Sequence, residues 1–152
     1  MNQENLIFTA HCGIYCGDCI HYKNKHSKLA SDLKRELERV GFDKYADIKS
    51  PFGEDLRYYK EFISVLNSLA NHYCNDPCRT GNGCSSTTCK IIKCCQSKKI
   101  IGCWECRQID SCEKFEFLEP RCGNMPKNNL KKIKKFGLDN WIEYRDQFYI
   151  WL

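Results

Sequence analysis

Apolar residues recur with a helical period after the first twenty residues of the chain. Leucine and valine follow one another at spacings of four, four and three residues, at Leu29, Leu33, Leu37 and Val40. This spacing puts the four side chains on one face and predicts an amphipathic helix. Ser27 or Ser31 is a candidate N-cap, and Gly41 is a candidate stop.

A second helix is predicted after a turn at Ser50-Pro51 and Gly53. It begins near Asp55, and its apolar residues share one helical face: Leu56, Tyr59, Phe62, Ile63, Leu66 and Leu69. Two more helices are predicted after Pro126, separated by Gly137. The first carries Leu130, Ile133 and Phe136, and the last carries Leu138, Trp141, Ile142, Tyr144, Phe148 and Leu152.

Residues 71–123, between these helical stretches, show no clean period of 3.6 or 2 residues. Turn-forming residues interrupt the segment at Asn75, Pro77, Gly81, Gly83 and Gly102. We therefore predict an irregular segment that buries too little apolar surface to order itself. Its order would come from its cysteines.

The predicted fold class is mainly α, a small helical domain with an irregular, cysteine-rich, metal-stapled centre. A length of 152 residues fits a single domain. Its predicted parts are a cysteine hook over 1–20, a helical pair over 21–72, a cysteine-rich block over 73–123, and C-terminal helices over 124–152.

Thirteen cysteines in this length indicate either disulfides or bound metal. Met1 to Ala10 lacks the features of a signal peptide, and no segment has 18 uninterrupted apolar residues. We therefore expect a cytoplasmic protein with no membrane association. A reducing cytosol and an odd cysteine count both favour metal over disulfides.

The N-terminal motif is Cys12-x3-Cys16-x2-Cys19, in which glycines let the backbone fold around one ion. Three thiolates leave one tetrahedral position for another ligand. A distant cysteine or histidine, water or a substrate can fill it, and His11 and His21 are the nearest histidines.

The central block holds more cysteines in short spacings, and Cys103-x2-Cys106 is the most zinc-like of them. The other candidate ligands of the block are Cys78, Cys84, Cys89, Cys94 and Cys112. Their grouping stays open, and Cys74, Cys95 and Cys122 also fit the role of small buried apolar residues. Zinc is the expected cofactor, with an iron–sulfur cluster as the alternative, because both take tetrahedral thiolates.

The sequence gives weaker support to two enzymatic functions. The spacing of the N-terminal motif also occurs in radical S-adenosylmethionine enzymes, but the alternating strands and helices that those enzymes need are not indicated. Thiol–disulfide exchange fits the two CxxC motifs, but neither lies in a βαβ context and both have additional cysteines nearby, which favours chelation.

Five lysines form the sharpest basic run, at Lys127, Lys131, Lys132, Lys134 and Lys135. They could form a nucleic-acid patch, but they also fill the polar positions that an amphipathic helix requires. A net charge of +5 permits an acidic partner without requiring one. Nucleic-acid binding is therefore not favoured, and no protein partner is identified.

The chain resembles a family of bacterial and archaeal cysteine-rich proteins called domain of unknown function 3795. The resemblance rests on CGIYCGDC from Cys12, CRTGNGCSSTTCKIIKCC from Cys78, GCWECRQIDSCEKF from Gly102, and the closing LKKIKKFGLDNWIEYRDQF. It implies metal binding, with zinc favoured, by ten residues: Cys12, Cys16, Cys19, Cys78, Cys84, Cys89, Cys94, Cys103, Cys106 and Cys112. It implies no activity.

These observations predict a structural-zinc interaction module with two or three zinc ions. One site would combine Cys12, Cys16 and Cys19 with a ligand from the central block, and the others would draw on Cys78 to Cys112. The sequence contains no Ser-His-Asp set, phosphate loop or paired-carboxylate motif, so a non-enzymatic role is favoured. An open-site redox metalloprotein and a nucleic-acid-binding zinc module remain the alternatives.

Overall fold

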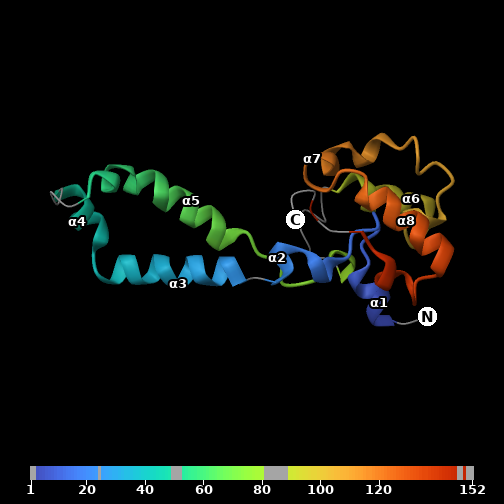
Figure 1. Ribbon diagram of the computed structural model, residues 1–152, viewed down its shortest axis with the longest axis horizontal. Coiled ribbons are helices and arrows are strands. Elements are labelled where there is room, and N and C mark those ends of the chain that lie inside the picture. The colour runs from blue at the N-terminus through green and yellow to red at the C-terminus, as the bar shows by residue number, and fades with distance from the viewer. Residues whose placement is uncertain (1–2, 24, 49–52, 81–88, 147–148, 150–152) are drawn as a thin grey trace. The chain divides into compact units, whose positions relative to one another are not determined.

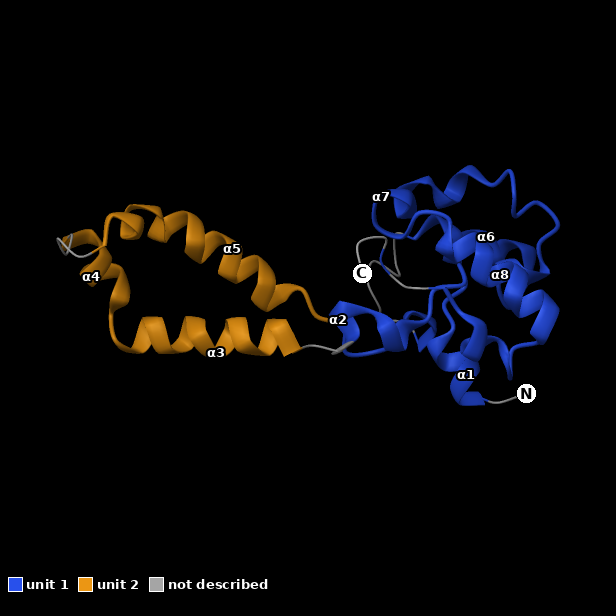
Figure 2. Ribbon diagram, viewed as in Figure 1, with its two compact units in different colours: residues 1–22, 74–152 blue, residues 23–73 orange. Residues whose placement is uncertain are grey.

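The computed structural model describes residues 3–23, 25–48, 53–80, 89–146 and 149 (Figure 1). Helices dominate these residues, and the β-pairing among them is a single bridge between Thr9 and Tyr15. The mainly α fold class is therefore confirmed. The chain divides into two compact units (Figure 2): unit 1 contains Met1–Tyr22 and Cys74–Leu152, and unit 2 contains Lys23–Tyr73. That both units fold as one domain stays a prediction.

Unit 2 is a helical hairpin that covers almost the same residues as the predicted helical pair. Its elements are α3 (Lys25–Arg39), α4 (Phe42–Ile48), the 3-10 helix η2 (Glu54–Tyr58) and α5 (Tyr59–Asn71). Helices α3 and α5 run antiparallel and contact each other (Figure 2). The predicted stop at Gly41 is confirmed, whereas Ser50-Pro51 lies outside the described residues.

The face that α3 buries differs from the predicted one. Ala30 is 5% exposed, whereas Leu29 and Leu33 are 69% and 45% exposed. Ser27 and Ser31 lie inside α3, so neither caps it. On α5, Leu66 is buried as predicted, but Phe62 is 42% exposed. The helical period was correct, but the position of the neighbouring helix decides which face is covered.

Unit 1 combines short helices from both ends of the chain. They are α1 (Gln3–Phe8), η1 (Cys16–Asp18), α2 (Ile20–Lys23, whose last residue falls in unit 2), η3 (Cys78–Thr80), α6 (Lys90–Lys98), η4 (Cys103–Glu105), η5 (Glu113–Leu118), α7 (Glu119–Cys122), α8 (Met125–Phe136) and η6 (Trp141–Tyr144). The predicted helix before Gly137 is confirmed as α8.

The predicted last helix is wrong over its described part. Its residues form only the short 3-10 helix η6, and the backbone at Arg145 is extended. Arg145 donates hydrogen bonds to the carboxylate of Asp18 in the N-terminal hook, which holds the extended conformation. The predicted positions Phe148 and Leu152 lie outside the described residues.

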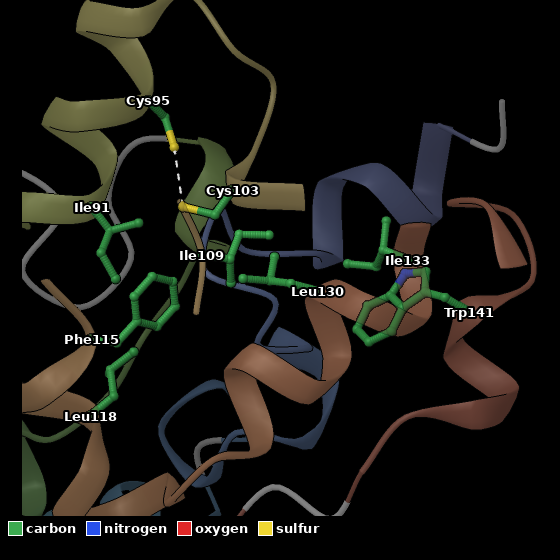
Figure 3. Packing of buried hydrophobic residues seen from close by; sticks show 9 residues of the cluster. All are labelled: Ile91, Cys95, Cys103, Ile109, Phe115, Leu118, Leu130, Ile133 and Trp141. Carbon is green, nitrogen blue, oxygen red and sulfur yellow. Dashed lines mark hydrogen bonds between the residues drawn. The ribbon is translucent and has the colours of Figure 1, made fainter. Parts of the chain in front are cut away.

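The hydrophobic core of unit 1 draws heavily on the central block, which is less irregular than predicted (Figure 3). Its buried members are Ile91, Cys95, Cys103, Ile109, Phe115, Leu118, Leu130, Ile133 and Trp141. Helix α6 contributes Ile91 and Cys95 from one face, with Cys95 acting as a small apolar residue. The block therefore contributes buried apolar side chains to the core, and the prediction that it needs its cysteines to become ordered stays a prediction.

The side chain of Trp141 connects the C-terminal segment of the chain to the N-terminal hook. Its side chain is fully buried, and its Nε1 donates a hydrogen bond to the Thr9 hydroxyl at 3.2 Å. The Thr9 hydroxyl donates in turn to the carbonyl of Asn5 at 2.6 Å. The ring of Tyr15 meets the indole edge to face at 6.2 Å. Residues more than 120 positions apart thus share one buried polar and aromatic contact.

The N-terminal hook contacts α8 directly at Gly13. Gly13 has a φ of +86°, and an added Cβ would lie 2.7 Å from the carbonyl oxygen of Pro126. The buried Asn129 donates its Nδ2 to the carbonyl of Gly13 at 3.0 Å and accepts from the backbone N–H of Asp146 at 2.9 Å. One buried amide therefore connects the hook, α8 and the C-terminal segment.

Replacing Gly13 by alanine should destabilise unit 1 by about 2–3 kcal/mol, since a left-handed backbone penalty adds to a clash with α8. Gly41→Ala is the matched control, because Gly41 has a φ of +62° but nothing within 4 Å of the added Cβ. It should lose only about 1 kcal/mol. Urea unfolding followed by circular dichroism measures both losses, since Gly41 lies in unit 2 and Gly13 in unit 1. Equal losses would contradict the close contact between hook and α8.

None of the helices in the described residues combines the length and apolar character that crossing a bilayer requires.

Candidate metal centre

The two CxxC motifs adopt the same local structure. In each, the backbone N–H of the second cysteine donates to the carbonyl of the first at 3.0 Å, from Cys19 to Cys16 and from Cys106 to Cys103. Both motifs form one 3-10 turn and leave it in an extended conformation. This compact turn presents two thiols from a short piece of chain, as metal-binding knuckles do.

Four thiols from distant parts of the sequence gather beside the hook, and we call them the Cys12 group: Cys12, Cys16, Cys78 and Cys89. The sulfur of Cys16 is buried and accepts a hydrogen bond from the backbone N–H of Cys78 at 3.4 Å. Cys78 begins η3, and Cys89 is the residue at the N-terminal boundary of α6. Three separate segments therefore contribute to this group.

Burial raises the pKa of the Cys12 thiol well above its usual range. A hydrogen bond from the backbone N–H of Ile14 partly opposes this shift, and the neighbouring thiols of Cys78, Cys89 and Cys16 raise the pKa further. Part of the Cys12 residue remains exposed, although its thiol is enclosed. Without a cation among them, these thiols therefore disfavour ionisation of one another.

Arg79 places a positive charge beside this group. Its Nε donates to the carbonyl of Thr9 at 3.0 Å, its Nη1 donates to the carbonyl of Ile101 at 2.8 Å, and its guanidinium lies 5.4 Å from the centre of the Trp104 ring. Burial lowers the pKa of Arg79, whereas the thiols of Cys78, Cys95, Cys16 and Cys12 raise it. A thiolate site carries negative charge, which this guanidinium would offset.

Two buried polar atoms near this group have no hydrogen-bond partner in the described structure: Nδ1 of His11 and Nη2 of Arg79. Burial and the nearby Arg79 charge lower the pKa of His11 to about 4. His11 is therefore neutral at pH 7 and retains a nitrogen lone pair, as a ligating imidazole does. Such atoms are rare in the interior of a protein, and an ordered water molecule, an ion or a ligand would satisfy them.

A second set of thiols lines a cavity of about 270 Å³, and we call them the cavity cysteines: Cys94, Cys95, Cys103, Cys106 and Cys112. The sulfurs of Cys95 and Cys103 are 3.6 Å apart (Figure 3). The hydrogen bond between them raises the pKa of Cys103 and lowers that of Cys95. Cys112 lies at the N-terminal boundary of η5.

Lys98, which also lines the cavity, donates a hydrogen bond to the sulfur of Cys106 at 3.6 Å. The neighbouring sulfur of Cys106, and more weakly those of Cys94 and Cys112, raise the pKa of Lys98. Lys98 thus accompanies the cavity cysteines, whereas Arg79 lies beside the Cys12 group and also interacts with Cys95 of the cavity.

Cys19 contacts a different set of residues. Its sulfur lies 3.8 Å from the hydroxyl of Tyr149, which also accepts a hydrogen bond from the backbone N–H of Ile20 at 3.3 Å. Cys122 and Tyr149 belong to a small buried cluster against which Cys19 packs. Burial raises the pKa of both Tyr149 and Cys122. The predicted grouping of Cys19 with Cys12 and Cys16 stays a prediction.

The twelve cysteines in the described part of the chain are free thiols, and Cys84 lies outside it. Among the described residues, no three His, Cys, Asp or Glu side chains are arranged to hold a metal ion. The donor atoms fit zinc or an iron–sulfur cluster in kind, but their present arrangement does not complete a site. A cysteine has a single side-chain torsion, so a rotamer change redirects its sulfur without moving the backbone.

Sequence reasoning missed three residues of these groups. Cys95 was set aside as a small apolar residue; it is buried in the core, but it also pairs with Cys103. Arg79 was not singled out, although it directly follows Cys78 in a glycine-rich stretch, which is the signal that could have found it. Tyr149 gave no local signal, because its contact with Cys19 joins opposite ends of the chain.

The lysine run lies on α8 and is engaged within the protein. Lys131 and Lys132 pair with the carboxylates of Asp110 and Asp146. Lys127 donates to the carbonyl of Asp110 at 3.3 Å, Lys134 donates to the carbonyl of Cys106 at 3.2 Å, and Lys135 lies over the ring of Phe136. These contacts favour the interpretation of a charged helix face that stabilises unit 1.

A family model described as "Protein of unknown function (DUF3795)" matches residues 8–117. The matched part is well over half of the chain and contains all ten candidate ligands, whereas the closing segment from Leu130 lies beyond it. No curated protein and no solved structure matches the chain. The predicted resemblance is confirmed, and the chain belongs to the DUF3795 family of proteins of unknown function.

Proposed function

We propose that this protein is a structural-zinc interaction module in which metal ions join the N-terminal hook to the central block. The observation that carries the proposal is the Cys12 group. Its members come from three segments, and the sulfur of Cys16 accepts a hydrogen bond from the backbone N–H of Cys78, 62 residues away. Thiols from distant segments are the usual ligands of structural zinc.

The first zinc site would use the Cys12 group, with Cys84, Cys19 and His11 as further candidate ligands. The second would use four of the cavity cysteines, with Cys94, Cys103, Cys106 and Cys112 as the leading set. Four thiolates and one Zn²⁺ carry a charge of about −2, which Arg79 and Lys98 would partly offset at the two sites. A site closed by four protein ligands supports structure rather than catalysis.

Zinc would contribute strongly to the stability of unit 1. Structural zinc sites in small peptides contribute on the order of 10–16 kcal/mol of apparent binding free energy. Metal binding would also account for the enclosed thiols, because coordination removes their protons and satisfies the sulfurs. A reducing cytoplasmic location would keep all thiols available for the metal.

An iron–sulfur cluster in the cavity is the second candidate. A volume of about 270 Å³ is larger than one zinc ion requires, and N–H donors such as Lys98 commonly tune cluster sulfurs. A cluster there would make the protein an electron carrier or sensor.

Anaerobic purification with a phosphine reductant, followed by elemental analysis, tests both candidates. We expect two zinc ions per chain and no visible absorption. Cys12→Ala and Cys89→Ala should each lose one zinc ion, and Cys106→Ala should lose the other. Cys122→Ala is the matched control, because Cys122 is buried beside Tyr149, and it should keep both ions.

Elemental analysis distinguishes between zinc, an iron–sulfur cluster and the absence of metal. Iron with equimolar acid-labile sulfide and visible colour would assign the cavity to a cluster. A folded protein that contains neither zinc nor iron would contradict metal binding altogether.

A further inference from the structure

Unit 2 exposes an unusual amount of apolar surface for a helical hairpin. Large apolar side chains that are 40% to 69% exposed recur along both long helices: Leu29, Leu33 and Val40 near α3, and Tyr58, Phe62, Val65 and Leu69 along η2 and α5. From Tyr58 to Leu69 the spacings are four, three and four residues, which place these side chains in a continuous stripe on one helical face. Exposed apolar stripes of this length usually serve association.

The two stripes lie on the same side of the hairpin. On α3, Leu29 and Leu33 each directly precede a residue of the face toward α5, Ala30 and Lys34, which are buried or half-buried. The same holds on α5, where Ile63, Leu66 and Ala70 are the buried or half-buried residues of the face toward α3. The exposed residues Phe62, Val65 and Leu69 each directly precede one of them. One residue is a rotation of about 100° around a helix. Because the helices are antiparallel, equal rotations bring both stripes to one common face, which we call the apolar face.

The opposite side of the hairpin carries more charge, although apolar side chains also lie there. It opens into a groove of about 1040 Å³ lined by Lys34, Glu38, Asp47 and Lys60 together with Leu37, Leu56, Tyr59 and Ile63. Lys34 and Glu38 form an ion pair there. Charged and apolar side chains are therefore mixed on the groove side, whereas the stripes on the other side consist of large apolar side chains.

The hairpin also has too small a core to hold its helices by itself. The buried apolar residues among its described positions are Ala30, Ala46 and Leu66. Two alanines and one leucine bury little surface, and isolated helix pairs of this size are marginal in water. Covering the apolar face would supply the missing core, as the second helix pair does in a four-helix bundle.

We propose that the apolar face is a dimer interface, on which the hairpin of a second copy of this chain packs to form a four-helix bundle. The charges beside the stripe of α3 are already paired within the helix, Arg35 with Asp32 and Arg39 with Glu36. A rim without excess charge of one sign suits a self-complementary twofold contact, in which each copy offers the same surface. An acidic or basic partner would need an oppositely charged rim.

The area of the apolar face agrees with the hairpin of a second copy as its partner. Seven large side chains that are 40% to 69% exposed leave on the order of 700 Å² of largely apolar surface. Each partner of a standard protein interface buries about 800 Å². The apolar face alone therefore approaches the area that a stable dimer needs, before its polar rim is counted.

Multi-angle light scattering on the full, metal-loaded chain at a series of concentrations tests the proposal. We expect a mass of twice 17.9 kDa for the unaltered protein. Leu33→Glu and Val65→Glu should raise the dissociation constant at least about tenfold each, because a buried charge at the centre of an interface is strongly unfavourable. Lys60→Glu, on the groove side, is the matched charge-changing control and should remain dimeric.

Circular dichroism shows whether a variant is monomeric only because it has unfolded. If Leu33→Glu loses helical signal even at high concentration, the neutral Leu33→Gln tests the same contact with a smaller perturbation, and it should weaken the dimer while keeping its helices. A monomeric unaltered protein at every concentration would overturn the proposal, as would dimers of equal stability in Leu33→Glu and Lys60→Glu. In either case the face would belong to a different partner.

Discussion

Removing the proposed metal should unfold much of unit 1, while the helices of unit 2, held by the proposed pairing of two hairpins, lose far less structure. The reason is the distribution of ligands, since all thirteen cysteines lie in unit 1 and none lies in Lys23–Tyr73. Loss of structural zinc removes stabilisation on the order of 10 kcal/mol, which is comparable to the whole stability of a small domain. Hydrogen exchange measured with and without a strong chelator should therefore show lost protection in α6 and the hook, and much smaller changes in α3 and α5.

Two controls make this result specific to the metal. Re-addition of zinc in reducing buffer should restore protection and tryptophan fluorescence, because the thiols remain intact. A chelator already saturated with zinc should have no effect. If the chelated protein keeps its melting temperature and its exchange pattern, the proposed structural role of metal is wrong, whichever cysteines are nearby.

Replacing Trp141 by alanine should destabilise unit 1 by about 3–5 kcal/mol, as deletion of a fully buried indole creates a large cavity. The substitution also removes the donor to the Thr9 hydroxyl and the edge-to-face contact with Tyr15. It therefore disconnects the C-terminal segment from the start of the chain. Urea unfolding followed by the fluorescence of the two remaining tryptophans, Trp104 and Trp151, which both belong to unit 1, measures the loss.

Tyr144 provides a matched control on the same 3-10 helix. It is 47% exposed, and its ring stacks on Phe136 at a centroid distance of 4.0 Å. Tyr144→Ala should lose only about 0.5–1.5 kcal/mol, the usual value of such a ring pair. Trp141→Phe should fall between the two alanine variants, since it keeps most of the volume but not the N–H donor. Similar losses for Trp141→Ala and Tyr144→Ala would contradict the anchoring role of Trp141.

Several features of the fold could be predicted from local sequence because they depend on neighbouring residues only. The helical periods of α3, α5 and α8 and the stops at Gly41 and Gly137 are of this kind. The prediction of the last helix was wrong because contacts with residues distant in the sequence decide the conformation there. Trp141 is held by Thr9, and Arg145 by Asp18, and these contacts favour a short turn followed by extended chain over a continuous helix.

The candidate site was predictable in composition but not in grouping. Spacing marked Cys16-x2-Cys19 and Cys103-x2-Cys106 as knuckles, and both form the same turn. It could not show that the sulfurs of one knuckle face different neighbours, Cys16 toward Cys78 and Cys19 toward Tyr149. Those neighbours lie 62 and 130 residues away in the chain, beyond the reach of any local pattern.

The amino-acid sequence by itself determined that the chain is helical, that its cysteines are confined to the two segments now found in unit 1, and that the stretch between them is a helical pair. Tertiary structure alone decided which face of α3 is buried, which thiols meet, and which cations lie beside them. The physical reason is that periodicity records where a side chain points around its own helix. Burial and thiol proximity depend on what the rest of the chain brings to that side.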